Sequence, residues 1–134
     1  MIHVYFGHHK CASTWTRGIL KQIHPGSYIS VSSDAEVCHY GRDLGAFIRA
    51  NHPDMLAVAN ACYQHLGDMP EYKAFHIIRD PRDIVVSAYY SHRDLPRADK
   101  EGQAYLRNAT LEDGLLQTIR DCRWEFENIY DWNY

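Results

Sequence analysis

Two widely separated stretches of the chain each run from apolar residues through a short polar turn into a helical pattern. The first covers residues 2–23 and the second covers residues 74–92. Alternation of strands and helices predicts an α/β fold of three layers, in which a mostly parallel sheet is flanked by helices. Ligands of such sheets bind outside the carboxyl ends of the strands. Both turns are therefore candidate binding sites.

The spacing of apolar residues and the positions of glycine and proline predict the individual elements. We expect strands at 2–6, 28–31, 55–59 and 74–78, helices at 13–23, 43–51, 80–92 and from 110 onward, a helical turn at 61–66 and a loop at 93–108. Ser13 or Thr14 is expected to cap the first helix, and Asp80 the third. The inward faces of the first and last helices are expected to carry Trp15, Ile19, Leu20 and Ile23, and Leu115, Ile119, Cys122, Phe126 and Ile129.

Length and composition predict one domain, residues 1–134, with a buried core, since 46% of the residues are hydrophobic. The net charge of −3 argues against nucleic-acid binding, so an anionic ligand has to be held by a few placed groups. No apolar run is long enough to span a membrane. The first residues do not have the pattern of a signal peptide.

Cysteines and histidines can serve as metal ligands, and cysteines can form disulfides. Cys11, Cys38, Cys62 and Cys122 are widely spaced and form no CxxC pair, which together with the missing export signal predicts reduced thiols and a cytoplasmic location. The histidines number nine, but their spacing gives no typical zinc ligand set. We therefore expect no metal.

The turn after the first expected strand has the composition of an anion-binding loop. Gly7 allows a tight turn, and the backbone N–H groups at the start of the following helix have no internal partners. Lys10 adds a cation, and Ser13 and Thr14 add hydroxyl donors. The spacing is not that of the GxxxxGK[ST] motif. A tight turn with an exposed lysine would explain the segment equally well.

The turn after the last expected strand offers a second cation. The guanidinium of Arg79 can bind a phosphate group through two hydrogen bonds. Ser87 lies in the following helix, so it reaches the same anion only if this helix passes close to the ligand. The alternative is that Arg79 pairs with Asp80 or Asp83, and that Ser87 bonds a carbonyl one turn earlier.

Together the two stretches resemble the sulfotransferases, which use 3′-phosphoadenosine 5′-phosphosulfate (PAPS). The first signature of this family, a Pro-Lys-x-Gly-Thr-Thr-Trp-like run, is similar to His9-Lys10-Cys11-Ala12-Ser13-Thr14-Trp15. The second signature, Arg-[Asn/Asp]-Pro-[Arg/Lys]-Asp followed by Val-Ser-x-Tyr, is similar to Arg79-Asp80-Pro81-Arg82-Asp83 followed by Val86-Ser87-Ala88-Tyr89. In the first signature, His9 stands at the proline position and Ala12 at the glycine position.

The resemblance implies a P-loop-NTPase-like sulfotransferase fold, PAPS as the co-substrate without a metal, and a hydroxyl or amine acceptor on a small molecule or glycan. It implies that the first signature binds the 5′-phosphosulfate and that Lys10 is also catalytic. The binding residues would be His9, Lys10, Cys11, Ala12, Ser13, Thr14 and Trp15. Arg79 and Ser87 would bind the 3′-phosphate. The run from Ala35 to Tyr40 is similar to a Glu-Val-His-Phe-Phe-like run of heparan-type members, so Glu36, and after it His39, is the expected general base.

Family members are usually longer, and their late Gly-x-x-Gly-x-Trp-type segment has no counterpart in this sequence. We therefore expect the N-terminal portion of the family fold, or a short member, completed by a homodimer or by a missing C-terminal segment. Two alternatives stay open. One is a small P-loop-like nucleotide or metabolite kinase with Asp80 as the magnesium ligand, and the other is a truncated, non-catalytic nucleotide-binding module.

Overall fold

The computed structural model describes residues 1–24, 26–31, 37, 40–96 and 98–133. Their packing divides the chain into two compact units, one formed by residues 1–78 and 128–134 and the other by residues 79–127. The single domain expected from the sequence stays a prediction. In the described part of the chain, no helix combines the length and the apolar character that crossing a membrane requires.

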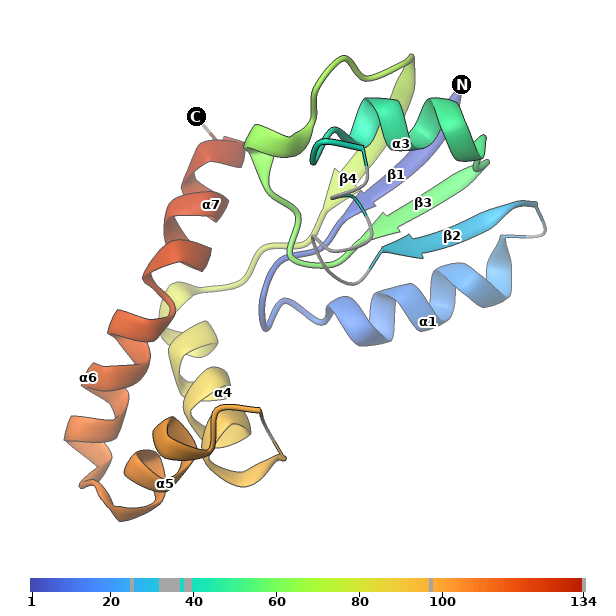
Figure 1. The fold of residues 1–134 in the computed structure, drawn as a ribbon. Coiled ribbons are helices and arrows are strands. Elements are labelled where there is room, and N and C mark those ends of the chain that lie inside the picture. Colours follow the sequence, from blue (N-terminus) through green and yellow to red (C-terminus); the bar gives the residue numbers. More distant parts are fainter. Residues whose placement is uncertain (25, 32–36, 38–39, 97, 134) are drawn as a thin grey trace. The chain divides into compact units, whose positions relative to one another are not determined.

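The first unit is a sheet with helices on both faces (Figure 1). Its strands are β1 (Ile2–Phe6), β2 (Tyr28–Val31), β3 (Met55–Val58) and β4 (Tyr72–His76). All the strand pairs are parallel, and the order is β2-β3-β1-β4. The α/β class and the parallel sheet predicted from the sequence are therefore confirmed.

The last strand lies two residues earlier than the predicted range 74–78. β4 pairs with β1 from Tyr72 opposite Ile2 to His76 opposite Phe6, so both strands end at the same level of the sheet. Ile78, which was expected inside a buried strand, lies beyond this edge and is 52% exposed. The position of the strand end is set by the partner strand and not by the local apolar run.

The two faces of the sheet are covered by different helices. α1 (Ser13–Ile23) and α3 (Leu44–Asn51) lie on opposite sides of the sheet (Figure 1). Because side chains alternate along a strand, one face of the strands packs with α3 and the other with α1. The α3 face contains Ile2, Val4, Phe6, Val31, Leu56 and Val58, together with Leu44, Phe47 and Ile48. The α1 face contains Tyr5, Met55 and Ala57, together with Leu20 and Tyr28.

The inward face of α1 differs from the predicted stripe. Leu20 packs against the sheet as expected. Trp15 and Ile23, however, are 69% and 67% exposed, and the buried residue of this helix is Thr16, one turn before Leu20. A stripe assigned from hydrophobicity alone misses a buried threonine and is therefore displaced around the helix.

The second unit consists of helices. α4 (Pro81–Asp94) packs against both α5 (Lys100–Asn108) and α6 (Leu111–Asp121). The approach of α6 to α4 requires a glycine, because a Cβ atom on Gly114 would lie 2.5 Å from Cε2 of Tyr89.

The loop predicted at 93–108 is wrong, since residues 100–108 form α5. The side chain of Asp99 accepts a hydrogen bond from the backbone N–H of Gly102, which caps the helix. Gln103 and Leu106 are its buried residues. The segment is strongly polar and contains Gly102, features that are typical of loops, so the sequence favoured a loop at this place.

Other elements agree with the prediction or refine it. The helical turn expected at 61–66 is present as η1 (Tyr63–His65). The single last helix is in fact two helices, α6 and α7 (Arg123–Asn133), which meet at the buried residue Cys122. Ile119, expected to face inward, is 46% exposed.

Candidate functional site

The turn after β1 is packed so closely that it requires a glycine. The N–H of Gly7 donates to the carbonyl of Val58, at 2.7 Å, and its own carbonyl accepts from the N–H of Ala61, at 2.8 Å. A Cβ atom at position 7 would lie 2.9 Å from Oγ of Ser13 and 3.0 Å from the carbonyl oxygen of Val58. Gly7 therefore allows β1, β3 and the start of α1 to meet at one point.

The backbone that follows has the conformation of an anion-binding nest. Lys10 and Ala12 have φ angles of +57° and +59°, whereas Cys11 between them does not have a positive φ. When the sign of φ alternates along a chain, successive N–H groups turn toward one concave side, where an anion can accept them. Such backbone strain in non-glycine residues is concentrated at functional sites. The N–H of Cys11 donates to the carbonyl of His8, at 3.2 Å, so a phosphate or sulfate group can be bound by the N–H groups of Ala12 and Ser13.

The helix start adds to the positive potential of this loop. Ala12 occupies the cap position of α1 and makes no side-chain hydrogen bond to the helix. The prediction that Ser13 or Thr14 caps α1 is wrong, because the hydroxyl of Ser13 donates to the carbonyl of His8, at 2.7 Å. A helix that begins without a side-chain cap presents its first N–H groups to a ligand.

The loop lies where the connections of the sheet diverge. The connection from β1 runs into α1 on one face, whereas the connection from β3 runs into η1, and the flanking residues Ala61 and Leu66 pack on the other face. β1 and β3 are neighbours in the sheet. Open α/β sheets bind their ligands in the crevice at such a point.

The residues of the first signature differ in their accessibility. Cys11 is buried, His9 and Lys10 are partly buried, and Thr14 is exposed. The backbone of Lys10 lies in the loop before α1, and the hydroxyls of Ser13 and Thr14 belong to the first turn of α1. Trp15 is 69% exposed. Among the described residues, no group of three or more His, Cys, Asp or Glu side chains could hold a metal ion.

A pair of histidines beside the loop was not found from the sequence. His8 follows β1 and His76 ends β4, and Nε2 of His8 lies 3.2 Å from Nδ1 of His76. His8 is 1% exposed. Its burial, and to a smaller extent the neighbouring His76, lowers the pKa of His8 to about 4. The pair could have been found only by knowing that β1 and β4 are neighbours.

The second junction belongs to the unit formed by residues 79–127. As predicted, Asp80 caps α4, with its carboxylate accepting from the backbone N–H of Arg82, at 2.9 Å. The same carboxylate binds the guanidinium of Arg82, with Nη2 2.7 Å from Oδ2. These hydrogen bonds from Arg82 lower the pKa of Asp80 to about 2. The carboxylate is therefore already engaged by neighbouring residues.

Arg79 forms an ion pair with Asp83, which is an alternative to binding a phosphate. Its Nε lies 3.5 Å from Oδ2 of Asp83, and both side chains are largely exposed. Ion pairs of this kind contribute little to stability, so a phosphate dianion can displace Asp83. Arg79 precedes α4, and Asp83 and Ser87, one turn apart, share a face of this helix.

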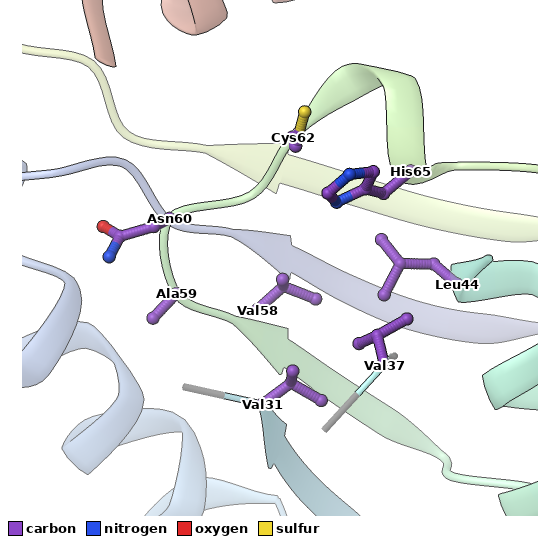
Figure 2. Close-up of a pocket in the computed structure, with 8 residues that line it drawn as sticks. All are labelled: Val31, Val37, Leu44, Val58, Ala59, Asn60, Cys62 and His65. Atoms are coloured by element: carbon purple, nitrogen blue, oxygen red, sulfur yellow. The ribbon is translucent and has the colours of Figure 1, made fainter. Parts of the chain in front are cut away.

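The last of the predicted site residues are the two expected general bases. Glu36 and His39, the expected general bases, lie outside the described residues. On the α3 face of the sheet, at the carboxyl ends of β2 and β3, a pocket is formed by Val31, Val37, Leu44, Val58, Ala59, Asn60, Cys62 and His65 (Figure 2). It is narrow, with room for about one water molecule. It is therefore too small to bind a nucleotide or an acceptor. Cys11, Cys62 and Cys122 are buried, and none of these three described cysteines is in a disulfide bond.

Comparison of the chain with protein-family models, with curated proteins and with solved structures gave no significant match.

Proposed function

We propose that the protein is a PAPS-dependent sulfotransferase or the nucleotide-binding part of one. The observation that carries this proposal is the loop from Lys10 to Ser13, in which alternating φ signs, a cation and an uncapped helix start occur together at the carboxyl end of β1. These features suit a tetrahedral anion. The resemblance to the family's two signatures selects the phosphosulfate among such anions.

The proposed reaction is an in-line transfer of the sulfuryl group. An acceptor oxygen or nitrogen forms a bond to sulfur, the bond between sulfur and the bridging oxygen of the 5′-phosphate breaks, and adenosine 3′,5′-bisphosphate (PAP) leaves. The acceptor proton passes to a base, for which Glu36 and His39 stay the candidates. Lys10 and the backbone N–H groups of the loop would stabilise the negative charge that develops on the leaving phosphate.

The second junction supplies the group for the 3′-phosphate. Arg79 binds this phosphate in exchange for its exposed pair with Asp83, and Ser87 adds a hydroxyl from the same face of α4. The alternative of a magnesium-dependent kinase is less well supported, because Asp80, its candidate metal ligand, accepts hydrogen bonds from the backbone and the guanidinium of Arg82.

The proposal is tested by measuring the release of PAP from PAPS, with water alone and with a panel of phenols, alcohols, amines and sugars as acceptors. We expect Lys10→Ala to lower kcat by about a hundredfold or more, since it removes a donor to the developing charge. Arg79→Ala should mainly raise KM for PAPS. Lys100→Ala, at an exposed lysine of α5, is the matched control and should leave both constants unchanged. A Lys10→Ala variant as active as the wild type would rule out the assigned role of this loop.

A further inference from the structure

A second basic site lies along α1, and Thr14 is the one residue of its lining that is also assigned to the phosphosulfate. An open groove between α1 and β2 is formed by Thr14, Arg17, Gly18, Lys21, Tyr28 and Ser30. Two of these residues are cations, and none of these described residues carries a carboxylate. The proposed reaction uses neither Arg17 nor Lys21.

The positively charged side of the groove is ordered by contacts between helix and strand. Nη1 of Arg17 donates to Oγ of Ser30, at 3.2 Å, and the hydroxyl of Tyr28 donates to the carbonyl of Arg17, at 3.2 Å. The Nε of Arg17 is buried and has no hydrogen-bond partner in the part of the chain that the structure describes. An arginine carries five N–H donors, so its guanidinium is oriented by Ser30 without being saturated.

Gly18 keeps the groove open. A Cβ atom at this position would have no atom within 4 Å, so no neighbour requires a glycine here. Gly18 has no side chain and lies between the two cations in the sequence, so it leaves space above the backbone for a bound chain.

The other side of the groove is an edge of the sheet. In the order β2-β3-β1-β4, β2 pairs with β3 on one side and is the edge strand of the described sheet. An edge strand presents a row of backbone N–H and C=O groups, to which an extended peptide can add as a further strand. The groove thus combines backbone groups on β2 with cations on α1.

The spacing of the two cations matches an extended peptide. Arg17 and Lys21 are four residues apart on a helix, which corresponds to roughly 6 Å along its axis. Alternate residues of a strand point to the same side and are spaced by roughly 6.5–7 Å. Carboxylates at positions i and i+2 of an added strand can therefore face Arg17 and Lys21 together.

We propose that the edge of β2 and the groove under α1 form a docking site for an extended acidic segment of a partner protein, in which acidic residues alternate with apolar ones. The segment adds to β2 through backbone hydrogen bonds, and its acidic side chains pair with Arg17 and Lys21. This site is independent of the proposed sulfuryl transfer and would exist even if the nucleotide assignment were wrong.

The test is fluorescence anisotropy with a labelled peptide of alternating aspartate and valine, titrated with the whole chain. Three peptides serve as comparisons: an isomer of the same composition with all aspartates consecutive, the asparagine analogue, and a version with alternate backbone nitrogens methylated. We expect the alternating peptide to bind and each comparison peptide to bind at least about fivefold more weakly, because charge, spacing and backbone pairing all contribute.

Variants of the chain assign the binding to the groove. Lys21→Glu reverses an exposed charge and Gly18→Leu fills the space above the helix, and each should weaken binding by about fivefold or more. Lys100→Glu is the matched control and should bind as the wild type does; circular dichroism checks that every variant is folded. The proposal is overturned if the alternating peptide does not bind, if the consecutive isomer or the methylated peptide binds equally well to the wild type, or if Lys100→Glu weakens binding as much as Lys21→Glu.

Discussion

His8 connects the proposed binding loop to the sheet through both its backbone and its side chain. Its carbonyl accepts hydrogen bonds from Oγ of Ser13 and from the N–H of Cys11, at 2.7 and 3.2 Å. Its ring, buried beside His76, lies 3.2 Å from the other ring between the ends of β1 and β4. A change in the charge of this ring therefore acts on the loop that carries Lys10.

The stability of the protein should fall as pH is lowered from 6.5 toward 4. Burial lowers the pKa of His8 from 6.5 to about 4, so in this range the unfolded chain binds a proton that the folded chain does not. Stability then rises with pH, and the contribution amounts to about 3 kcal/mol across the whole range. The free energy of unfolding, measured by urea denaturation at several pH values, gives the slope directly.

The variant His8→Gln should flatten this slope, whatever its effect on stability at neutral pH. His52→Asn is the matched control, since His52 is exposed and has a φ angle of +49° that asparagine also tolerates. This control should keep the slope of the wild type. An unchanged slope in His8→Gln would show that His8 is not the group that titrates.

The junction of β1 and α1 depends on two residues, one constrained by space and the other by its backbone conformation. Gly7 is needed for space, as shown by the close approach of Ser13 and Val58. Ala12, at the cap position of α1, is instead strained, because its φ of +59° is a conformation that costs a residue with a Cβ atom roughly 1–2 kcal/mol. The family signature has glycine at this position.

The variant Ala12→Gly should therefore raise the free energy of unfolding, by up to about 1 kcal/mol after the added freedom of the unfolded chain is subtracted. Ala104→Gly, at an exposed position inside α5, is the matched control and should lower it by about 1 kcal/mol. Urea denaturation of both variants at one pH provides the comparison. A loss in Ala12→Gly as large as the loss in Ala104→Gly would contradict the strained conformation of this loop.

The helices and strands differ in how well the sequence predicts their bounds and inward faces. The β1 range was predictable from its apolar run, and the α3 range from its apolar spacing. In the structure, the carboxylate of Asp43 caps α3 by accepting from the N–H of Ala46, at 2.9 Å. α5 was missed because its segment is strongly polar and contains Gly102, so its composition resembles that of a loop. The inward face of α1 was displaced because its buried residue, Thr16, is polar.

At the scale of the whole molecule, the alternation of strands and helices predicted a parallel α/β sheet, but it did not predict the order of the strands. The order depends on pairings between distant segments, such as Phe6 with Val58 and with His76. For the same reason, the loop from Lys10 to Ser13 was expected to bind an anion, whereas the pair of His8 and His76 beside it was not expected. The loop could be predicted from residues that are neighbours in the sequence. The residues around it could not, because tertiary contacts bring them there.

The proposed function requires that one nucleotide is bound by two separate junctions of the chain, one containing Lys10 and the other Arg79. The residues of the two signatures belong to different compact units of the chain. A ligand that needs both junctions must therefore lose affinity when either one is altered. A nucleotide with a single phosphate would need only one of them.

The most direct measurement is a calorimetric titration of PAP, compared with 5′-AMP, into the wild type, Lys10→Ala and Arg79→Ala. We predict that the wild type binds PAP at least about tenfold more tightly than 5′-AMP, because the 3′-phosphate gains charge-assisted hydrogen bonds. Arg79→Ala should abolish this preference, and Lys10→Ala should weaken the binding of both nucleotides. Equal affinity of the wild type for PAP and 5′-AMP, or a preference for PAP that survives in Arg79→Ala, would contradict the account.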